Sequence, residues 1–162
     1  MSFAEQLEAT WPARFIADHP WSFPSLEIVH LPGLTVVLGG MVLLDLRLLG
    51  MGRVLSIKLL QRHILPCVWA GFTVAAASSL WLVLYEATRL MTNPAFVIKM
   101  ILLPVVALNA WLMHRYLQRD LARRDIHVMA SLRVRMSAVL SLLLWCVILA
   151  CGRLIAYYYA LF

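Results

Sequence analysis

Four long apolar stretches occupy most of the chain and are separated by short polar connections. They lie at residues 25–49, 64–88, 95–117 and 136–160. Each is long enough to cross the hydrocarbon core of a bilayer, which requires about 20 predominantly apolar residues. The pattern predicts an all-α integral membrane protein: a four-helix transmembrane bundle at residues 25–162, preceded by a separate N-terminal segment at residues 1–24.

The N-terminal segment mixes aromatic and polar residues. Trp11, Phe15 and Trp21 would anchor an amphipathic segment at the membrane interface. The segment has no basic n-region, no apolar h-region and no small-residue cleavage site. We therefore expect no cleaved signal peptide.

The composition strengthens the membrane assignment. Of the 162 residues, 63% are hydrophobic and 14% are charged, and the mean hydropathy of +0.85 is well above that of water-soluble globular domains. Cys67, Cys146 and Cys151 lie inside the predicted spans without CxxC spacing. We interpret them as buried apolar residues rather than as disulfide or metal-binding residues.

The basic residues are concentrated in two connections, so the formal net charge of +6 does not indicate nucleic-acid binding. Basic residues gather in the cytoplasmic loops of membrane proteins. This pattern places both connections in the cytoplasm and both termini on the outer (periplasmic) side. Ten of the fourteen Lys and Arg residues form the two groups: Arg47, Arg53, Lys58 and Arg62 in the first, and Arg115, Arg119, Arg123, Arg124, Arg133 and Arg135 in the second.

Small residues and turn residues suggest how the helices pack and end. Gly71, Ala75 and Ser79 recur at every fourth position, and with Gly39 and Gly40 they would let helix backbones approach closely in lipid. The first span should end near Gly50 and Gly52, and the basic segment at 53–63 should continue into the second span as a helical extension. Asn93-Pro94 predicts a tight turn before the third span.

The ionisable residues inside the spans sort into two layers. Such residues are costly in a bilayer and are candidates for function by default. The outer layer holds Glu27 and His30, which share a helix face, so the Glu27 carboxylate could accept one imidazole proton and leave the other nitrogen for a metal. Lys99 and Arg153 could neutralise a bound dianion such as the haem propionates. The alternative is a network of carboxylates and cations that only satisfies itself; Glu86 and Tyr157 belong near this layer.

The inner layer contains two further histidines. His63 opens the second span and His114 lies near the end of the third, so they should have similar depths. Imidazole is a common axial ligand of b-type haem, but histidines beside Arg62 and Arg115 are also typical of solvated headgroup neighbours. Asn109 adds polarity to the helix of His114. The remaining members of the layer are Asp45 and Arg47.

Geometry limits how these residues can combine. His30 and His114 lie near opposite ends of their helices, and at about 1.5 Å per residue their depths differ by about 15–20 Å. One iron cannot bind both, so two sites are needed if both are ligands. Arg47 is expected to extend to lipid phosphates, whereas Asp45 should point into the bundle toward a basic partner.

Four motifs together resemble a family of small uncharacterised bacterial four-helix inner-membrane proteins. The motifs are E-x-x-H at 27–30, D-L-R-L-L-G at 45–50, N-P-x-F-x-x-K-M at 93–100 and C-G-R at 151–153. A fainter similarity reaches the copper resistance D membrane domain and the membrane protoporphyrinogen oxidase, which resembles a b-type haem protein. That similarity implies His30 as a ligand and Lys99 as the matching lysine. The glycine-tryptophan signature of those families is missing here, since Leu38-Gly39-Gly40 occupies the region, and His63 matches no motif of the close family.

These observations predict a haem b-binding inner-membrane protein that transfers electrons with a membrane or periplasmic redox partner, alone or as a homo-oligomer. Its role as an oxidoreductase component stays open, and no catalytic residue is identified. One alternative is copper binding or transport, with His30 and His114 as metal ligands; the methionines lack the clustered spacing that Cu(I) favours. Another is a structural subunit of a membrane complex. The candidate haem-binding residues are His30, His114, His63, Lys99 and Arg153, supported by Glu27, Asp45 and Asn109.

Overall fold

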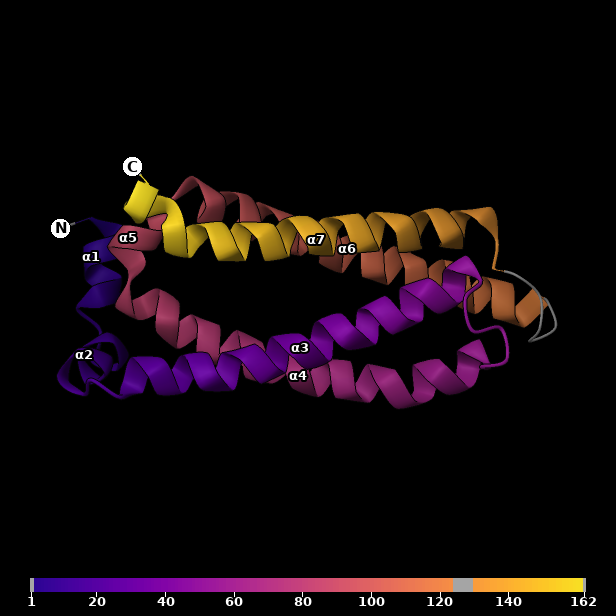
Figure 1. Ribbon diagram of the computed structural model, residues 1–162, viewed down its shortest axis with the longest axis horizontal. Helices are drawn as coiled ribbons and strands as arrows, with labels where there is room; N and C mark the ends of the chain where they lie inside the picture. Colours follow the sequence, from indigo (N-terminus) through magenta and orange to yellow (C-terminus); the bar gives the residue numbers. More distant parts are fainter. Residues whose placement is uncertain (1, 124–129, 162) are drawn as a thin grey trace.

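The structure, a computed structural model, describes the backbone of residues 2–123 and 130–161 and the side chains of residues 2–119 and 130–158. Over this part of the chain it is all-α, as the sequence predicts (Figure 1). Three helices are short: α1 (Phe3–Glu8), α2 (Trp11–Asp18) and α5 (Ala87–Met91). Four are long: α3 (Ser22–Leu49), α4 (Ile57–Tyr85), α6 (Pro94–Arg123) and α7 (Leu132–Leu161).

The four long helices confirm the predicted membrane spans. Each is long and apolar enough to cross a bilayer, so the chain is a multi-pass membrane protein in contact with lipid. α4 begins at Ile57, ahead of the apolar stretch, so the helical extension predicted at 53–63 is confirmed from Ile57 onward, whereas residues 53–56 are not helical. The N-cap of α4 is the Ser56 side chain, which accepts from the Leu59 N–H. Residues 124–129, between α6 and α7, lie outside the described residues.

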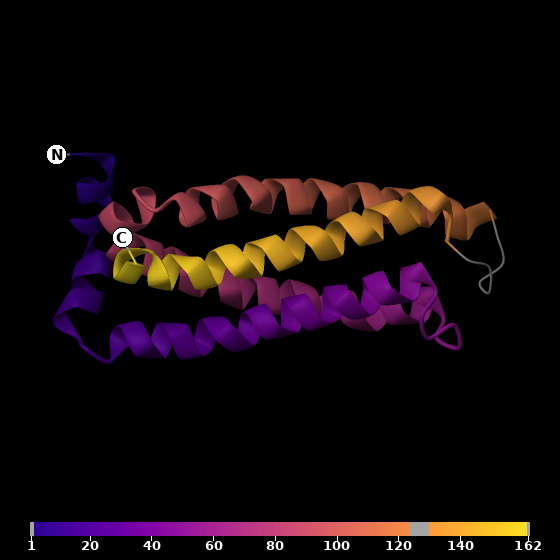
Figure 2. The same ribbon diagram turned by 45° about the horizontal axis from the view of Figure 1, so that its top comes forward.

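The long helices pack in two pairs, α3 with α4 and α6 with α7, and α3 also contacts α7 (Figures 1 and 2). We call the end that carries α1, α2 and α5 the terminal end, and both chain termini lie there. The opposite end, which carries the connection between α3 and α4, the end of α6 and the start of α7, is the loop end. The placement of the loop end in the cytoplasm stays a prediction from the basic residues.

The buried core lies along the contacts of α3 with α4 and α7 and of α6 with α7. It is apolar and follows helical spacing on each contributing helix, as expected for one stripe of each helix that faces its neighbours. Its members are Val37, Met41, Leu44 and Leu48 of α3, Ile57 of α4, Val106, Met113 and Leu117 of α6, and Val134, Ala138, Trp145 and Ile148 of α7.

Glycine brings α3 and α4 into close contact. A Cβ placed on Gly33 would lie 2.9 Å from the backbone nitrogen of Ala75 and 2.9 Å from the carbonyl oxygen of Gly71. A Cβ on Gly71 would lie equally close, 2.9 Å, to the carbonyl oxygen of Gly33. Neither position has room for a side chain, since the obstacles are backbone atoms. Gly40 also packs tightly, against Val68, whereas Gly39 has nothing within 4 Å and is not a packing position.

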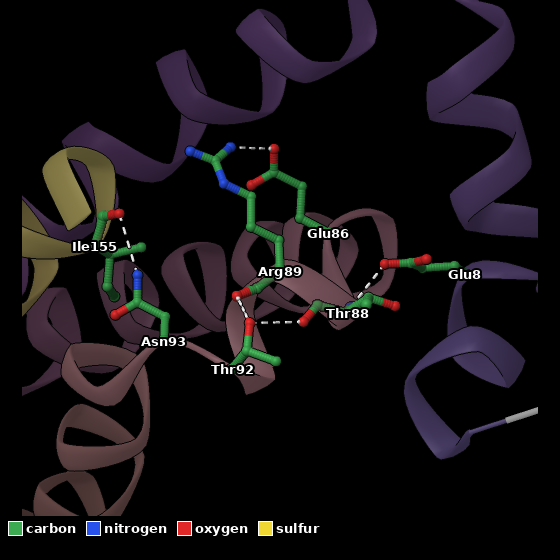
Figure 3. A network of polar contacts seen from close by, with 7 residues as sticks. All are labelled: Glu8, Glu86, Thr88, Arg89, Thr92, Asn93 and Ile155. Atoms are coloured by element: carbon green, nitrogen blue, oxygen red, sulfur yellow. Dashed lines mark hydrogen bonds and ion pairs between the residues drawn. The ribbon is translucent and has the colours of Figure 1, made fainter. Parts of the chain in front are cut away.

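Side-chain hydrogen bonds join α6 to α7. The Asn109 amide donates to the carbonyl oxygen of Ser137 at 3.0 Å and accepts from the Ser137 hydroxyl at 2.8 Å, and both residues are buried. Near the terminal end, fully buried Asn93 accepts from the Ala95 N–H at the start of α6 and donates to the carbonyl oxygen of Ile155 on α7. The predicted tight turn at Asn93 is confirmed, and it also ties the two helices together (Figure 3).

The N-terminal helices lie against the terminal end of the bundle (Figures 1 and 2). Glu8 of α1 accepts from the backbone N–H of Thr88 at the start of α5 (Figure 3), and the ring of Trp11 contacts the ring of Trp81 on α4. Trp11, Phe15 and Trp21 stay exposed. Exposed aromatic rings at the end of a transmembrane bundle are typical of an interfacial anchor.

The connection at the loop end closes over Arg47. Gly50 ends α3 in the left-handed region, with φ of 107°, and the N–H groups of Gly50 and Met51 bond back to the carbonyls of Arg47 and Leu46. The buried guanidinium of Arg47 donates to the carbonyl oxygens of Leu55, at 2.6 Å, and Arg53, at 3.3 Å. The expectation that Arg47 extends to lipid phosphates is therefore wrong, because its side chain folds back under its own loop.

Candidate functional site

His30 lies on α3 and is held by α4. Its Nδ1 atom is 3.0 Å from the carbonyl oxygen of Ala75 and 3.0 Å from the hydroxyl oxygen of Ser78. Gly33 follows His30 by three residues and so shares its helix face. The close contact between Gly33 and Ala75 is what brings the imidazole within reach of the Ala75 carbonyl.

This contact fixes the tautomer of His30. A carbonyl oxygen can only accept, so the proton must be on Nδ1, which leaves a lone pair on Nε2. Metal-binding histidines commonly donate their second ring N–H to a backbone carbonyl in this way, which orients the ring. The imidazole is only half-buried, so Nε2 is not enclosed by the chain's own core.

Glu27 does not take the role that the sequence suggests. The expectation that its carboxylate accepts the His30 proton is wrong, because the Ala75 carbonyl holds that proton instead. Glu27 is exposed and makes no hydrogen bond among the described side chains, although it lies close enough to act electrostatically on the imidazole.

Lys99 lies across the bundle from this pair and also acts electrostatically on His30. Its ammonium group reaches α7, where a Cβ placed on Gly152 would lie 3.9 Å from Nζ. Among the described side chains, no carboxylate pairs with Lys99. The structure thus groups His30, Glu27 and Lys99 in one layer near the terminal end, as predicted, with Lys99 as a cation without a counter-ion.

Arg153 is the next cation along this side of the bundle. It lies one turn before Tyr157, donates to the Tyr157 hydroxyl at 2.6 Å, and stacks over the tyrosine ring at 4.6 Å. Both side chains are exposed. Glu86, placed near this layer by the sequence, instead pairs with Arg89 at 3.0 Å (Figure 3). Arg153 therefore keeps guanidinium N–H groups available for an anion, whereas Glu86 already has a partner.

The two histidines of the loop-end half lie on different helix pairs. His63 is exposed on α4, with its Nδ1 2.9 Å from the carbonyl oxygen of Leu59 one turn earlier. His114 is exposed on α6, where Arg115 stacks over Trp111. No hydrogen bond joins the two histidines within the described chain, so a shared site at this depth stays a prediction from the sequence.

Asn109 and Asp45 are both buried, but only the Asn109 side chain has hydrogen-bond partners. The Asn109 amide is satisfied by Ser137, so its present role is to join α6 to α7. Asp45 points into the bundle as predicted, but the expected basic partner is not there. It faces the buried hydroxyl of Ser141 on α7, and neither carboxylate oxygen has a partner at hydrogen-bond geometry.

The sequence does not identify three of the residues that position His30. Ala75 and Ser78 provide its polar partners, and Gly33 allows their approach. Ala75 was recognised only as a small packing residue. A sequence signal for Gly33 did exist, since it lies one turn after His30 on the same face, but a glycine beside Pro32 also reads as a simple helix irregularity.

The comparisons with known proteins add no assignment. Within the described residues, no group of three or more His, Cys, Asp or Glu side chains could hold a metal ion. The chain matches no protein family, no curated protein and no solved structure. The similarities to the four-helix family, the copper resistance D domain and the protoporphyrinogen oxidase therefore stay predictions. The fold alone establishes the class of protein: a four-span membrane protein with its helices packed in pairs.

Proposed function

We propose that this membrane protein binds haem b through His30 and takes part in electron transfer with a membrane or periplasmic partner. The observation that carries the proposal is the contact between His30 Nδ1 and the Ala75 carbonyl oxygen, which fixes Nε2 as the nitrogen available to iron. Haem would supply one-electron redox chemistry at this site.

The surrounding cations fit the anionic edge of such a cofactor. Lys99 has no carboxylate partner among the described side chains, and Arg153 retains free guanidinium donors beside Tyr157. Either could bind a propionate, because hydrogen bonds between ammonium or guanidinium groups and carboxylates are among the stronger ones in proteins. Glu27 would keep the entrance of the site polar.

The donor set around His30 contains one imidazole, which distinguishes this proposal from copper binding. Cu(I) sites favour several soft sulfur or imidazole ligands, and the described residues offer no group of three or more His, Cys, Asp or Glu. A single imidazole is enough to hold haem, as in proteins with a proximal histidine. His114 and His63 stay candidates for a second site.

Absorption spectra of the detergent-purified protein test the proposal. Wild type expressed with ample haem should show a Soret band that shifts on dithionite reduction. His30→Ala should lose it, because the ligand is gone. His19→Ala is the matched control, since His19 is an exposed histidine outside the long helices and its loss should leave the band intact.

Two results separate the alternatives. Colourless wild-type protein that contains copper by elemental analysis contradicts the proposal in favour of a copper protein. Protein with neither chromophore nor metal, in which His30→Ala changes only the assembly state, indicates a structural subunit.

A further inference from the structure

Asp45 is the most isolated ionisable group in the described chain. It lies on the buried face of α3 with 0% of its surface exposed, and both carboxylate oxygens lack a hydrogen-bond partner. Its neighbours one turn away on the same face, Met41 and Leu48, belong to the apolar core. An ionised carboxylate in such surroundings is strongly disfavoured unless it is neutralised.

The facing surface of α7 is weakly polar and carries no cation that reaches Asp45. Ser141 is buried opposite the carboxylate, and Trp145, one turn further along α7, buries an indole N–H that has no partner. Ala138, one turn before Ser141, is apolar and fully buried. The site therefore offers a hydroxyl group, which can stand beside a neutral carboxyl group but cannot balance a negative charge.

Charged groups at this end are engaged elsewhere, are directed outward or, in the case of half-buried Arg135, do not pair with Asp45. The Arg47 guanidinium is held by the carbonyl oxygens of Leu55 and Arg53, and Arg135 of α7 makes no ion pair with Asp45. Arg62 and His63 of α4 and His114 of α6 are exposed. No ion pair to Asp45 exists among the described side chains.

A metal cation fits the site poorly. Sodium and other hard cations require several oxygen ligands, whereas the groups around Asp45 supply one carboxylate and one hydroxyl. A proton needs only one carboxylate oxygen. Proton uptake therefore removes the cost of the buried charge with the groups that are present.

We propose that Asp45, facing Ser141 across the contact between α3 and α7, is a proton-binding site inside the loop-end half of the bundle. The carboxyl group holds the proton at neutral pH, and the Ser141 hydroxyl faces it. This site is distinct from the one at His30 and does not depend on haem binding. It gives the membrane interior a group that can take up and release a proton.

Infrared difference spectroscopy of the purified protein in detergent tests this directly. Wild type at neutral pH should show the carbonyl band of a protonated carboxylic acid, and the band should disappear in Asp45→Asn, which conserves size and shape. Glu27→Gln is the matched control, because Glu27 is an exposed carboxylate on the same helix and its loss should leave the band in place. Absence of the band from wild type at neutral pH would overturn the proposal.

Two further measurements test the proposal even if Asp45→Asn does not fold. Ser141→Ala should leave the band in place, because neither carboxyl oxygen depends on a hydrogen-bond partner; loss of the band from folded Ser141→Ala contradicts the proposal. Replacing choline chloride by sodium chloride should leave the wild-type band unchanged. If sodium abolishes the band at neutral pH, the site binds a metal cation and the proposal is wrong.

Discussion

The α3–α4 pair associates through close backbone contact, whereas the α6–α7 pair associates through side-chain hydrogen bonds. In the first pair, Gly33 and Gly71 leave no room for side chains between the helices. In the second, Asn109 and Ser137 exchange two hydrogen bonds in the core. Both are ways to join helices in lipid, where burial of apolar surface drives association only weakly.

The difference matters for the candidate site. Close contact places the Ala75 carbonyl beside His30 and thereby orients its imidazole, while leaving Nε2 free. In the second pair, Asn109 bonds to the hydroxyl and the carbonyl oxygen of Ser137, so these groups join the helices and do not orient a ligand-binding side chain. The glycine contact between α3 and α4 therefore orients the candidate ligand His30, whereas the Asn109–Ser137 contact only holds α6 and α7 together.

The largest effect is expected from Gly33→Leu. The new side chain would meet backbone atoms of Ala75 and Gly71, which cannot rotate away, so α3 and α4 must separate. We expect the free energy of unfolding to fall by about 3 kcal/mol, measured by circular dichroism during titration with a denaturing detergent. Separation should also remove His30 from Ala75.

Gly39→Leu is the control for Gly33→Leu, because nothing lies within 4 Å of a Cβ at Gly39. It should unfold within about 0.5 kcal/mol of wild type, as surface substitutions usually do. If both leucine variants lose equal stability, close helix contact at Gly33 is not what holds the first pair together.

An intermediate effect is expected from Asn109→Leu. The change removes both hydrogen bonds to Ser137 in the core, and interhelical hydrogen bonds in membrane proteins contribute about 0.6 kcal/mol each, with larger values near 1.7. We expect a loss of about 1–2 kcal/mol in the same detergent titration.

Ser137→Ala sharpens this measurement, because it removes only the bond from the hydroxyl and keeps the bond to the Ser137 carbonyl oxygen. It should cost about half as much as Asn109→Leu. Equal losses would show that the carbonyl bond contributes nothing.

The smallest effect is expected from Gly39→Ala. Alanine is favoured over glycine in a helix by up to about 1 kcal/mol, and the position faces open space. The variant should be slightly more stable than wild type in the same titration. A clear loss of stability would mean that Gly39 contacts a second copy of the chain.

The four spans, the helical start of α4 and the turn at Asn93 could be predicted from the sequence. Apolar runs, capping residues and proline determine these features through neighbouring residues in the chain. α5 was not predicted as a separate helix, since its residues continue the apolar stretch of α4 and only the break at Glu86 divides them. The sequence also predicts that His30 and Lys99 lie in one layer. Helix direction and position along the helix determine the depth of a residue in the membrane.

Partners could not be predicted in the same way. The sequence indicated that Asp45 faces inward, but which side chain opposes it depends on the rotation of α7. Arg47 was assigned to lipid because the fold of its own connection was unknown. Helix spacing pairs Glu27 with His30, whereas in the structure the imidazole N–H donates to the Ala75 carbonyl oxygen on another helix. The position of a backbone carbonyl on a neighbouring helix has no signal in the sequence.

The measurement that tests the central claim most directly is the absorption spectrum of purified wild type beside His30→Ala and Gly33→Leu. If the glycine contact orients His30 as a haem ligand, wild type shows a Soret band that shifts on reduction, His30→Ala lacks it, and folded Gly33→Leu retains little of it. A wild-type Soret band that persists unchanged in His30→Ala would contradict the account.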